Sequence, residues 1–420
     1  MIGLFVVASS VIKKQQEFGE EVKRKVSELL KEEELKVFDL VVDVKSAEEI
    51  VRKLKNEISG CIIVVATGGT QQITRTLSTI NKPTLIWAHP SQNSLPSSLE
   101  AYSKLKENYP VKIFYSPLNS TALPTINSFI RVCKAIEKLE NSKIGCVGES
   151  PTWPLTPNVE RTIKNLGPSI VKINVSELVD KMEKVDIDKA KKFCDALKEK
   201  FGEIEVSDDD VFKGCKCYLA MEKLISKYKL SAITIRCFDL LKYNFTACTG
   251  MSVCNDEGII AGCEADLQAT LTMMIVSFIA NQPCWMANPS RIDEKRNTIT
   301  FSHCTIATKM IKNFSKATLL PHMESGKGVA VRGPLENREV TLVRLGGNLN
   351  KMLIARGKIV RSDMREKDLC RTQAEVKLSG KVRDWLDNTL GNHQILMYGN
   401  WESELIDFCK FKKIEPIIVK

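Results

Sequence analysis

The chain has 420 residues, 43% of them hydrophobic and 27% charged, which is enough for two or three domains with full-sized cores in a globular protein. The net charge of +10 is spread along the chain without an arginine-rich block, which argues against a nucleic-acid partner. No apolar run approaches the roughly 20 residues of a membrane span, so we expect no membrane partner. Fourteen cysteines without a signal-peptide pattern predict a cytoplasmic location.

The first 140 residues alternate short β-branched runs, such as IGLFVVA, CIIVVAT and PTLIWAH, with amphipathic stretches. Five strands alternating with helices predict a parallel, doubly wound sheet of flavodoxin-like or Rossmann-like type. Ligands bind such sheets at the carboxyl ends of the strands. Gly68 and Gly69 follow the third strand, but they lack the spacing of a nucleotide-binding loop and are a weak signal. The expected helices span 11–31, 46–58, 96–108 and 124–140.

A second α/β unit begins with KIGCVGES and continues through a helical stretch over 184–228 to the strand SAITIRCF. Short alternating runs between residues 284 and 378, including TITFSHC and EVTLVRL, are typical of an antiparallel sheet or barrel. A helix over 401–411 and the strand EPIIV close the chain. The predicted fold is therefore α/β, with domains over 1–141, 142–255 and 256–420.

Three residues in the last third of the chain have the chemistry of metal ligands. Glu264 opens an apolar run with helical spacing, so we expect it on the first turn of a buried helix. His303 ends TITFSH, and His393 lies in LGNHQILMYGN. A carboxylate and two neutral imidazoles suit an ion such as Mn²⁺, which leaves positions open for substrate oxygens. Since no HxH or HExxH motif is present, a paired glutamate and hydrogen-bonded buried histidines remain the alternative.

Other polar and aromatic residues stand in settings that allow contact with a ligand. Trp153 and Trp285 could stack on a sugar face, although core packing is the commoner role for a tryptophan. Several polar side chains in strand-rich segments could line a pocket or face water: His322, Glu324, Arg371, Gln373 and Glu375.

The runs GIIAGCEADLQATLTMMIVSFIANQP, TFSHCTIA and LGNHQILMYGNWESEL resemble the carboxy-terminal half of the L-fucose isomerase and L-arabinose isomerase family. WAHPSQNSLPSSLEA and KIGCVGESPTW are similar to that family's two amino-terminal α/β domains, so the resemblance covers nearly the whole chain. It implies two doubly wound Rossmann-like domains followed by a domain with an antiparallel β-barrel. It also implies a homotrimer or homohexamer whose sites lie at subunit interfaces, closed by loops near 9–10 and 89–93 of a neighbouring subunit.

The resemblance further implies aldose–ketose interconversion of a pentose or 6-deoxyhexose through a cis-enediol, with Mn²⁺ holding the sugar oxygens. Glu264 matches one of the two carboxylates that move the proton. The second should lie in CWMANPS, where the chain has Asn288, and an amide has no proton to exchange near neutral pH. The alternative proton carriers are then Glu324, Asp266 or a metal-bound water.

We expect four residues to bind the substrate: Trp285, Asn288, His89 and Trp153. Two other interpretations stay open because of Asn288. The chain could be a non-catalytic carbohydrate-binding protein on the isomerase scaffold, or it could perform a different metal-assisted carbonyl chemistry at the same site.

Overall fold

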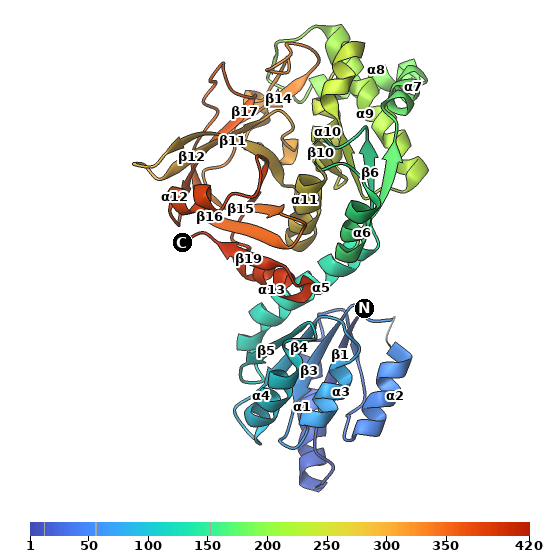
Figure 1. Cartoon of the computed structure of the whole chain (residues 1–420), viewed down its shortest axis with the longest axis vertical. Coiled ribbons are helices and arrows are strands. Elements are labelled where there is room, and N and C mark those ends of the chain that lie inside the picture. The colour runs from blue at the N-terminus through green and yellow to red at the C-terminus, as the bar shows by residue number, and fades with distance from the viewer. Residues whose placement is uncertain (12, 55–56, 152) are drawn as a thin grey trace. The chain divides into compact units, whose positions relative to one another are not determined.

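The computed structural model describes residues 1–11, 13–54, 57–151 and 153–420. The chain divides into two compact units, coloured along the sequence in Figure 1. Unit 1 comprises Met1–Glu137 and Ile406–Lys413, and unit 2 comprises Lys138–Leu405 and Ile414–Lys420. The expected division of the second unit near residue 255 stays a prediction.

Unit 1 is built on a five-stranded parallel sheet, which confirms the doubly wound prediction. Its strand order, β2-β1-β3-β4-β5, is the flavodoxin-like order. The strands are β1 (Ile2–Val7), β2 (Leu35–Val37), β3 (Gly60–Val65), β4 (Thr84–Ala88) and β5 (Val111–Tyr115). The helices are α1 (Lys13–Leu29), α2 (Val44–Leu54), α3 (Gln71–Ser78), α4 (Ser94–Leu105) and α5 (Leu123–Glu140), after the short η1 (Ser120–Ala122). The sequence did not predict α3, because its segment QQITRTLS is mostly polar and buries one face.

Unit 2 begins with a four-stranded parallel sheet in the order β10-β9-β6-β7. Its strands are β6 (Lys143–Val147), β7 (Ser169–Ile173), β9 (Ala232–Ile235) and β10 (Ile260–Cys263). The accompanying helices are α6 (Pro157–Leu166), α7 (Val175–Glu183), α8 (Ile187–Lys198), α9 (Asp208–Tyr228), η2 (Cys237–Tyr243) and α10 (Cys248–Asp256).

The expected helical stretch over 184–228 is wrong, because it is two helices, α8 and α9, separated by a short strand. That strand, β8 (Glu203–Ile204), pairs with β13 (Thr318–Leu320). Ser207 then caps α9, its hydroxyl accepting a hydrogen bond from the backbone N–H of Asp210. A tertiary strand pairing therefore overrides the local helical pattern.

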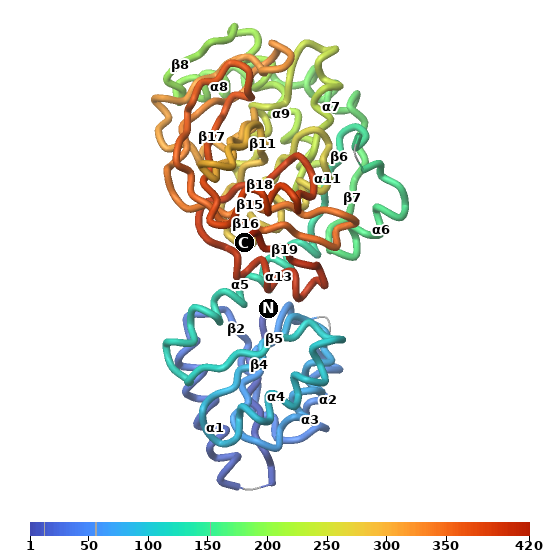
Figure 2. Tube along the Cα trace, turned by 60° about the vertical axis from the view of Figure 1, so that its left-hand side comes forward, coloured from blue at the N-terminus to red at the C-terminus, as the bar shows by residue number. Residues whose placement is uncertain are grey.

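Six antiparallel strands close into a barrel, as predicted for the last domain. Their order around the barrel is β15-β18-β11-β12-β17-β16, and β16 pairs back to β15. The strands are β11 (Trp285–Asp293), β12 (Thr298–His303), β15 (Glu339–Gly346), β16 (Lys351–Ser362), β17 (Thr372–Leu378) and β18 (Gln394–Tyr398). The last strand, β19 (Glu415–Ile418), lies parallel to the start of β16 (Figure 2). The other elements are β14 (Ala330–Arg332), η3 (Thr308–Met310), η4 (Phe314–Lys316), α12 (Val382–Asp387) and α13 (Glu402–Lys412).

One buried helix joins the parallel sheet of unit 2 to the barrel. This helix, α11 (Leu267–Ala280), packs against β9 and β10 on the sheet and against β15 and β18 on the barrel. It is apolar nearly all round, as a core helix must be. The segment before it, residues 264–266, consequently lies where the carboxyl end of β10 meets the barrel. Among the helices of the described ranges, none is both long and apolar enough to cross a membrane.

Candidate metal centre

Glu264 lies in the turn that joins β10 to α11 and not on the first turn of the helix, where the sequence pattern placed it. Both Glu264 and Ala265 have left-handed backbone conformations, with φ of 58° and 52°. Non-glycine residues persist in this region only where their surroundings hold them, and they cluster at functional sites. Asp266 then caps the helix, its Oδ1 accepting the N–H of Ala269 at 2.8 Å. The cap ends the turn and leaves the Glu264 side chain outside the helix.

The three predicted ligands converge in unit 2 from distant segments. His303 is the last residue of β12, and His393 directly precedes β18, so the two histidines flank β11 in the barrel. One ligand atom of each histidine and a carboxylate oxygen of Glu264 all lie within 4.8 Å of one another. The histidines are buried, whereas 32% of the Glu264 side chain is exposed. The cluster is thus open toward solvent on the carboxylate side.

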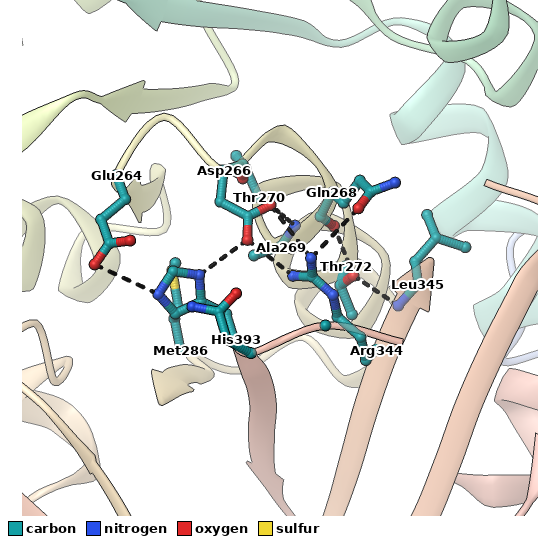
Figure 3. A network of polar contacts seen from close by, with 12 residues as sticks. Glu264, Asp266, Gln268, Ala269, Thr270, Thr272, Met286, Arg344, Leu345 and His393 are labelled. Atoms are coloured by element: carbon teal, nitrogen blue, oxygen red, sulfur yellow. Dashed lines mark hydrogen bonds and ion pairs between the residues drawn. The ribbon is translucent and has the colours of Figure 1, made fainter. Parts of the chain in front are cut away.

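His393 is oriented by Asp266, as Figure 3 shows. Its Nδ1 lies 2.9 Å from Asp266 Oδ2. An ionised carboxylate only accepts hydrogen bonds, so Nδ1 carries the proton and donates it. The other ring nitrogen, Nε2, lies 3.7 Å from Glu264 Oε1 and is buried without a hydrogen-bond partner among the described residues. A carboxylate on one imidazole nitrogen, with the other nitrogen left open, is the usual arrangement of a metal-binding histidine.

Arg344 completes the support of Asp266. Its guanidinium is buried and donates to Asp266 Oδ2 over 3.1 Å and to Gln268 Oε1 over 3.4 Å. Burial alone would raise the pKa of Asp266, but the hydrogen bond of His393 and the charge of Arg344 hold it well below its usual range. The carboxylate is therefore ionised with both oxygens engaged, which suits it to orienting His393. The Asp266 carboxylate is therefore poorly suited to carry the proton, a role for which the sequence analysis kept it as an alternative.

The protonation states of the other two ligands favour a cation. The imidazole of His393, with Nε2 3.7 Å from Oε1, lowers the pKa of Glu264 in spite of burial, so this carboxyl is ionised at neutral pH. Burial and the neighbouring His393 lower the pKa of His303 to about 3, and its Nδ1 lies 2.9 Å from the Thr305 hydroxyl. Burial also lowers the pKa of His393, but the hydrogen bond to Asp266 and the nearby Glu264 carboxylate outweigh it and leave that pKa raised. One carboxylate and two imidazoles, one of which must lose its proton, fit a divalent ion of intermediate softness.

Asn288 lies in β11 beside the cluster. The neighbouring Ala287 pairs with Gln394, so continuing the antiparallel register places Asn288 next to His393. On its other side Asn288 pairs with Ser302, which precedes His303. Its Oδ1 accepts a hydrogen bond from Asn392 at 3.4 Å. The segment CWMANPS, expected to carry the second acid, thus lies beside the cluster, and the residue that it places there is the amide Asn288.

The loop that follows β13 carries two further titratable residues, His322 and Glu324. His322 is buried, and its Nδ1 lies 3.0 Å from the Ser325 hydroxyl. Burial lowers the pKa of His322, and the charge of Glu324 acts in the opposite direction. Glu324, predicted as a catalytic residue, is exposed on the same loop.

The remaining predicted binding residues stay predictions, and the structure shows their surroundings. Trp285 is fully buried in the barrel strand β11. Trp153 is half-buried in the segment between β6 and α6. His89, in unit 1, is buried with Nε2 3.0 Å from the Ala66 carbonyl oxygen and Nδ1 3.1 Å from the Ser91 hydroxyl. Nε2 of His89 thus contacts the backbone that follows β3, and Nδ1 contacts the loop that follows β4.

Known proteins that resemble this chain are sugar isomerases by name. The chain is 26% identical over 311 residues to sulfoquinovose isomerase of Priestia aryabhattai, covering 68% of this chain and 66% of the relative, and it matches the Priestia megaterium protein equally. It is 22% identical over 358 residues to sulfoquinovose isomerase of Clostridium sp. (strain MSTE9), covering 81% and 79%. The chain thus spans just under two thirds of the length of the Priestia relatives. No family model matches the chain. The similarity is distant, at 22–26% identity, and the relatives share the name of sugar isomerases.

Proposed function

We propose that the protein is a metal-dependent aldose–ketose isomerase that works through a cis-enediol. The observation that carries the proposal is the convergence of Glu264, His303 and His393, with the buried Nε2 of His393 facing the cluster. A buried polar nitrogen without a partner is costly, and an ion at this position would satisfy it. The similarity to named sugar isomerases supports the same class of reaction.

A divalent ion such as Mn²⁺, when bound, supplies Lewis-acid polarisation of the sugar carbonyl, which acidifies the neighbouring C–H. Glu264, His303 and His393 would hold the ion, while Asp266 and Arg344 keep His393 in the tautomer that leaves Nε2 open. Glu264 is ionised and partly exposed, so its carboxylate is the base for the C2 proton. The loop carrying His322 and Glu324 supplies the second proton carrier that Asn288 cannot be.

The substrate class is a further part of the proposal. The relatives are named for sulfoquinovose, and the motifs of the chain resemble isomerases of a pentose and a 6-deoxyhexose. We propose an aldose of five or six carbons, tested with L-arabinose, L-fucose and sulfoquinovose. Metal-free protein, protein loaded with Mn²⁺ and protein stripped again by a chelator are each assayed for ketose. We expect the loaded protein, but not the metal-free or stripped protein, to form ketose from at least one sugar. If the loaded protein forms no ketose from any of the sugars, the proposed isomerase activity is refuted.

A second candidate function is carbohydrate binding without turnover. The observation in its favour is Asn288, because the amide stands where a carboxylate would complete the proton-transfer pair. Loaded protein would then bind an aldose, measured by calorimetry, and form no ketose. Binding together with ketose formation would eliminate this candidate.

We also propose that the chain assembles as a homotrimer or homohexamer, with unit 1 of one subunit closing the site of another. Support comes from a cavity of about 600 Å³ at the carboxyl edge of the unit 1 sheet, lined by Ser9, Gln15, Gln71, Gln92, Asn93 and Glu100 among others. Amides and hydroxyls suit sugar hydroxyl groups. Sedimentation analysis should give three or six chains per particle, and a fully active monomer would contradict the assembly.

A further inference from the structure

Two cysteine thiols lie in contact directly behind the candidate metal centre. Cys237 Sγ and Cys263 Sγ are 3.3 Å apart, and both side chains are buried. Cys263 ends β10 and pairs with Ile235, the last residue of the neighbouring parallel strand β9. Cys237 follows Ile235 by two residues and begins η2. The two sulfurs therefore meet where adjacent strands end.

The backbone of Cys263 leads straight into the strained turn. Glu264, the next residue, is the candidate ligand with a left-handed backbone. The N–H of Cys263 is held by Met286 Sδ at 3.4 Å, and the N–H of Ala265 by the Ile235 carbonyl oxygen at 3.0 Å. A sulfur is a weak acceptor, so the N–H of Cys263 is held less firmly than the N–H of Ala265, while the Cys263 carbonyl oxygen accepts the N–H of Asp266 at 3.1 Å.

We propose that Cys237 and Cys263 form a reversible disulfide that controls metal binding at Glu264. The oxidant is a hydroperoxide such as hydrogen peroxide, which is small enough to reach a nearly buried thiol. One thiol attacks the peroxide and becomes a sulfenic acid with release of water, and the second thiol displaces a second water to give the disulfide. The two thiols lose two electrons and two protons, and one peroxide is reduced to two waters.

The geometry explains why this bond would disturb the ligand. A disulfide needs its sulfurs about 2.05 Å apart, so the 3.3 Å contact must close by more than 1 Å. Metal ligands tolerate displacements of about 0.2 Å from their preferred distances. Because Cys263 is bonded directly to Glu264, any part of this closure that moves the Cys263 backbone by more than the tolerance displaces the carboxylate. The oxidised protein should bind the ion more weakly.

Coupling of this kind is reciprocal. If the disulfide weakens metal binding by some factor, a bound ion must disfavour the disulfide by the same factor. A tenfold coupling corresponds to a midpoint potential about 30 mV more positive in the loaded protein. The metal would thus protect the thiols, and loss of the metal would expose the protein to oxidation.

The test uses the full chain, metal-free, with and without hydrogen peroxide that is afterwards removed by catalase. Peptide mapping under non-reducing conditions should find the 237–263 link, and Mn²⁺ affinity by calorimetry should fall at least tenfold and return after dithiothreitol. Cys237→Ala should keep its affinity after peroxide. The matched control Cys146→Ala removes a buried thiol at the end of the neighbouring strand β6, whose Sγ donates to the Gly148 carbonyl oxygen, and should behave as the wild type.

The outcomes separate this inference from the proposed function, on whose metal site it rests. Reduced wild type that binds no Mn²⁺ would overturn both. Reduced protein that binds Mn²⁺, but whose oxidation gives no 237–263 link or a link without loss of affinity, would overturn this inference alone. If peroxide links only Cys304 and Cys370, which pack together with Cys248, this inference alone would also be overturned. If Cys237→Ala fails to fold, the peptide map of the wild type and its Mn²⁺ affinities before and after peroxide still test the inference.

Discussion

Asp266 contacts His393 through a hydrogen bond of 2.9 Å, and the same carboxylate caps α11 and pairs with the buried Arg344. One side chain thus links the start of a core helix, a buried cation in the barrel and the orientation of a candidate ligand. The candidate metal centre is therefore held by the packing of unit 2, because α11 contacts both the parallel sheet and the barrel.

Asp266→Asn should weaken metal binding without removing the helix cap, because asparagine caps helices as well as aspartate does. The neutral amide holds the Nδ1–H of His393 less well than an ionised carboxylate. Loss of such a partner typically costs 10- to 100-fold in affinity. Calorimetry with Mn²⁺ measures the change, and Asp180→Asn, at an exposed position on α7, is the control. Unchanged affinity would mean that Asp266 does not orient a ligand.

Arg344→Leu should destabilise the protein, because breaking a buried ion pair by removing one partner costs about 3–5 kcal/mol. The loss depends on pH in a defined direction. The folded pKa of Asp266 lies below its value of 3.8 in an unfolded chain, so the stabilisation is fully present above that value and is lost as the pH falls through the folded pKa. The difference in unfolding free energy should therefore be largest at neutral pH and shrink below about pH 4.

Denaturant unfolding of wild type and variant across this range measures the difference. Arg338→Leu is the control, since its pair with Glu336 is exposed and worth less than about 1 kcal/mol. A stability difference that did not change with pH would show that Arg344 acts through packing alone.

The sequence predicted the layers of the fold because apolar periodicity reports burial. Runs such as CIIVVAT became buried parallel strands, and the alternating runs after residue 284 closed the barrel. The break between α8 and α9 was missed: Ser207 and the aspartates after it signal the start of α9, whereas the short strand before them depends on pairing of Glu203 with Thr318, far along the chain.

The three candidate metal ligands could be named from their chemistry together with the resemblance, and the structure brings them together, but the residues that support them could not be predicted. Hydrophobic periodicity carries no information on the sign of φ, so it placed Glu264 in the helix and not in the left-handed turn. The pairing of Arg344 with Asp266 spans 78 positions, and in EVTLVRL an arginine resembles an ordinary solvent-facing residue. Only the three-dimensional structure shows that its guanidinium is buried.

Metal binding should weaken as the pH falls. The pKa of His393 is raised above 6.5 in the metal-free protein, and a protonated imidazole cannot bind a metal. His303, with a pKa of about 3, stays neutral throughout this range. At pH 6 each Mn²⁺ should therefore release about one proton, seen by calorimetry in buffers of different ionisation enthalpy. Binding without proton release at pH 6 would argue against His393 as a ligand.

Asn288→Asp should increase the rate of ketose formation if position 288 is where the second acid belongs. General acid–base groups typically contribute 10²- to 10⁴-fold, so the gain should be easy to measure in kcat. Asn392→Asp is a matched control, because it places a charge on the hydrogen-bonded neighbour of Asn288. If the wild type already forms ketose and the Asn288→Asp variant has the same kcat, position 288 does not carry the second proton. The loop of His322 and Glu324 would then be assigned that role.

The most direct measurement of the central claim follows the C2 hydrogen of the aldose. Protein loaded with Mn²⁺ is incubated in deuterated water with the aldose that gives ketose, or with each sugar of the panel, and deuterium at C2 is followed by NMR. The wild type should introduce deuterium at C2, and Glu264→Gln should abolish the exchange, because the amide neither binds the ion as a carboxylate does nor accepts the proton. Exchange that persists in Glu264→Gln, or loaded wild type that binds an aldose without any exchange, would contradict Glu264 as the base of a metal-dependent isomerase.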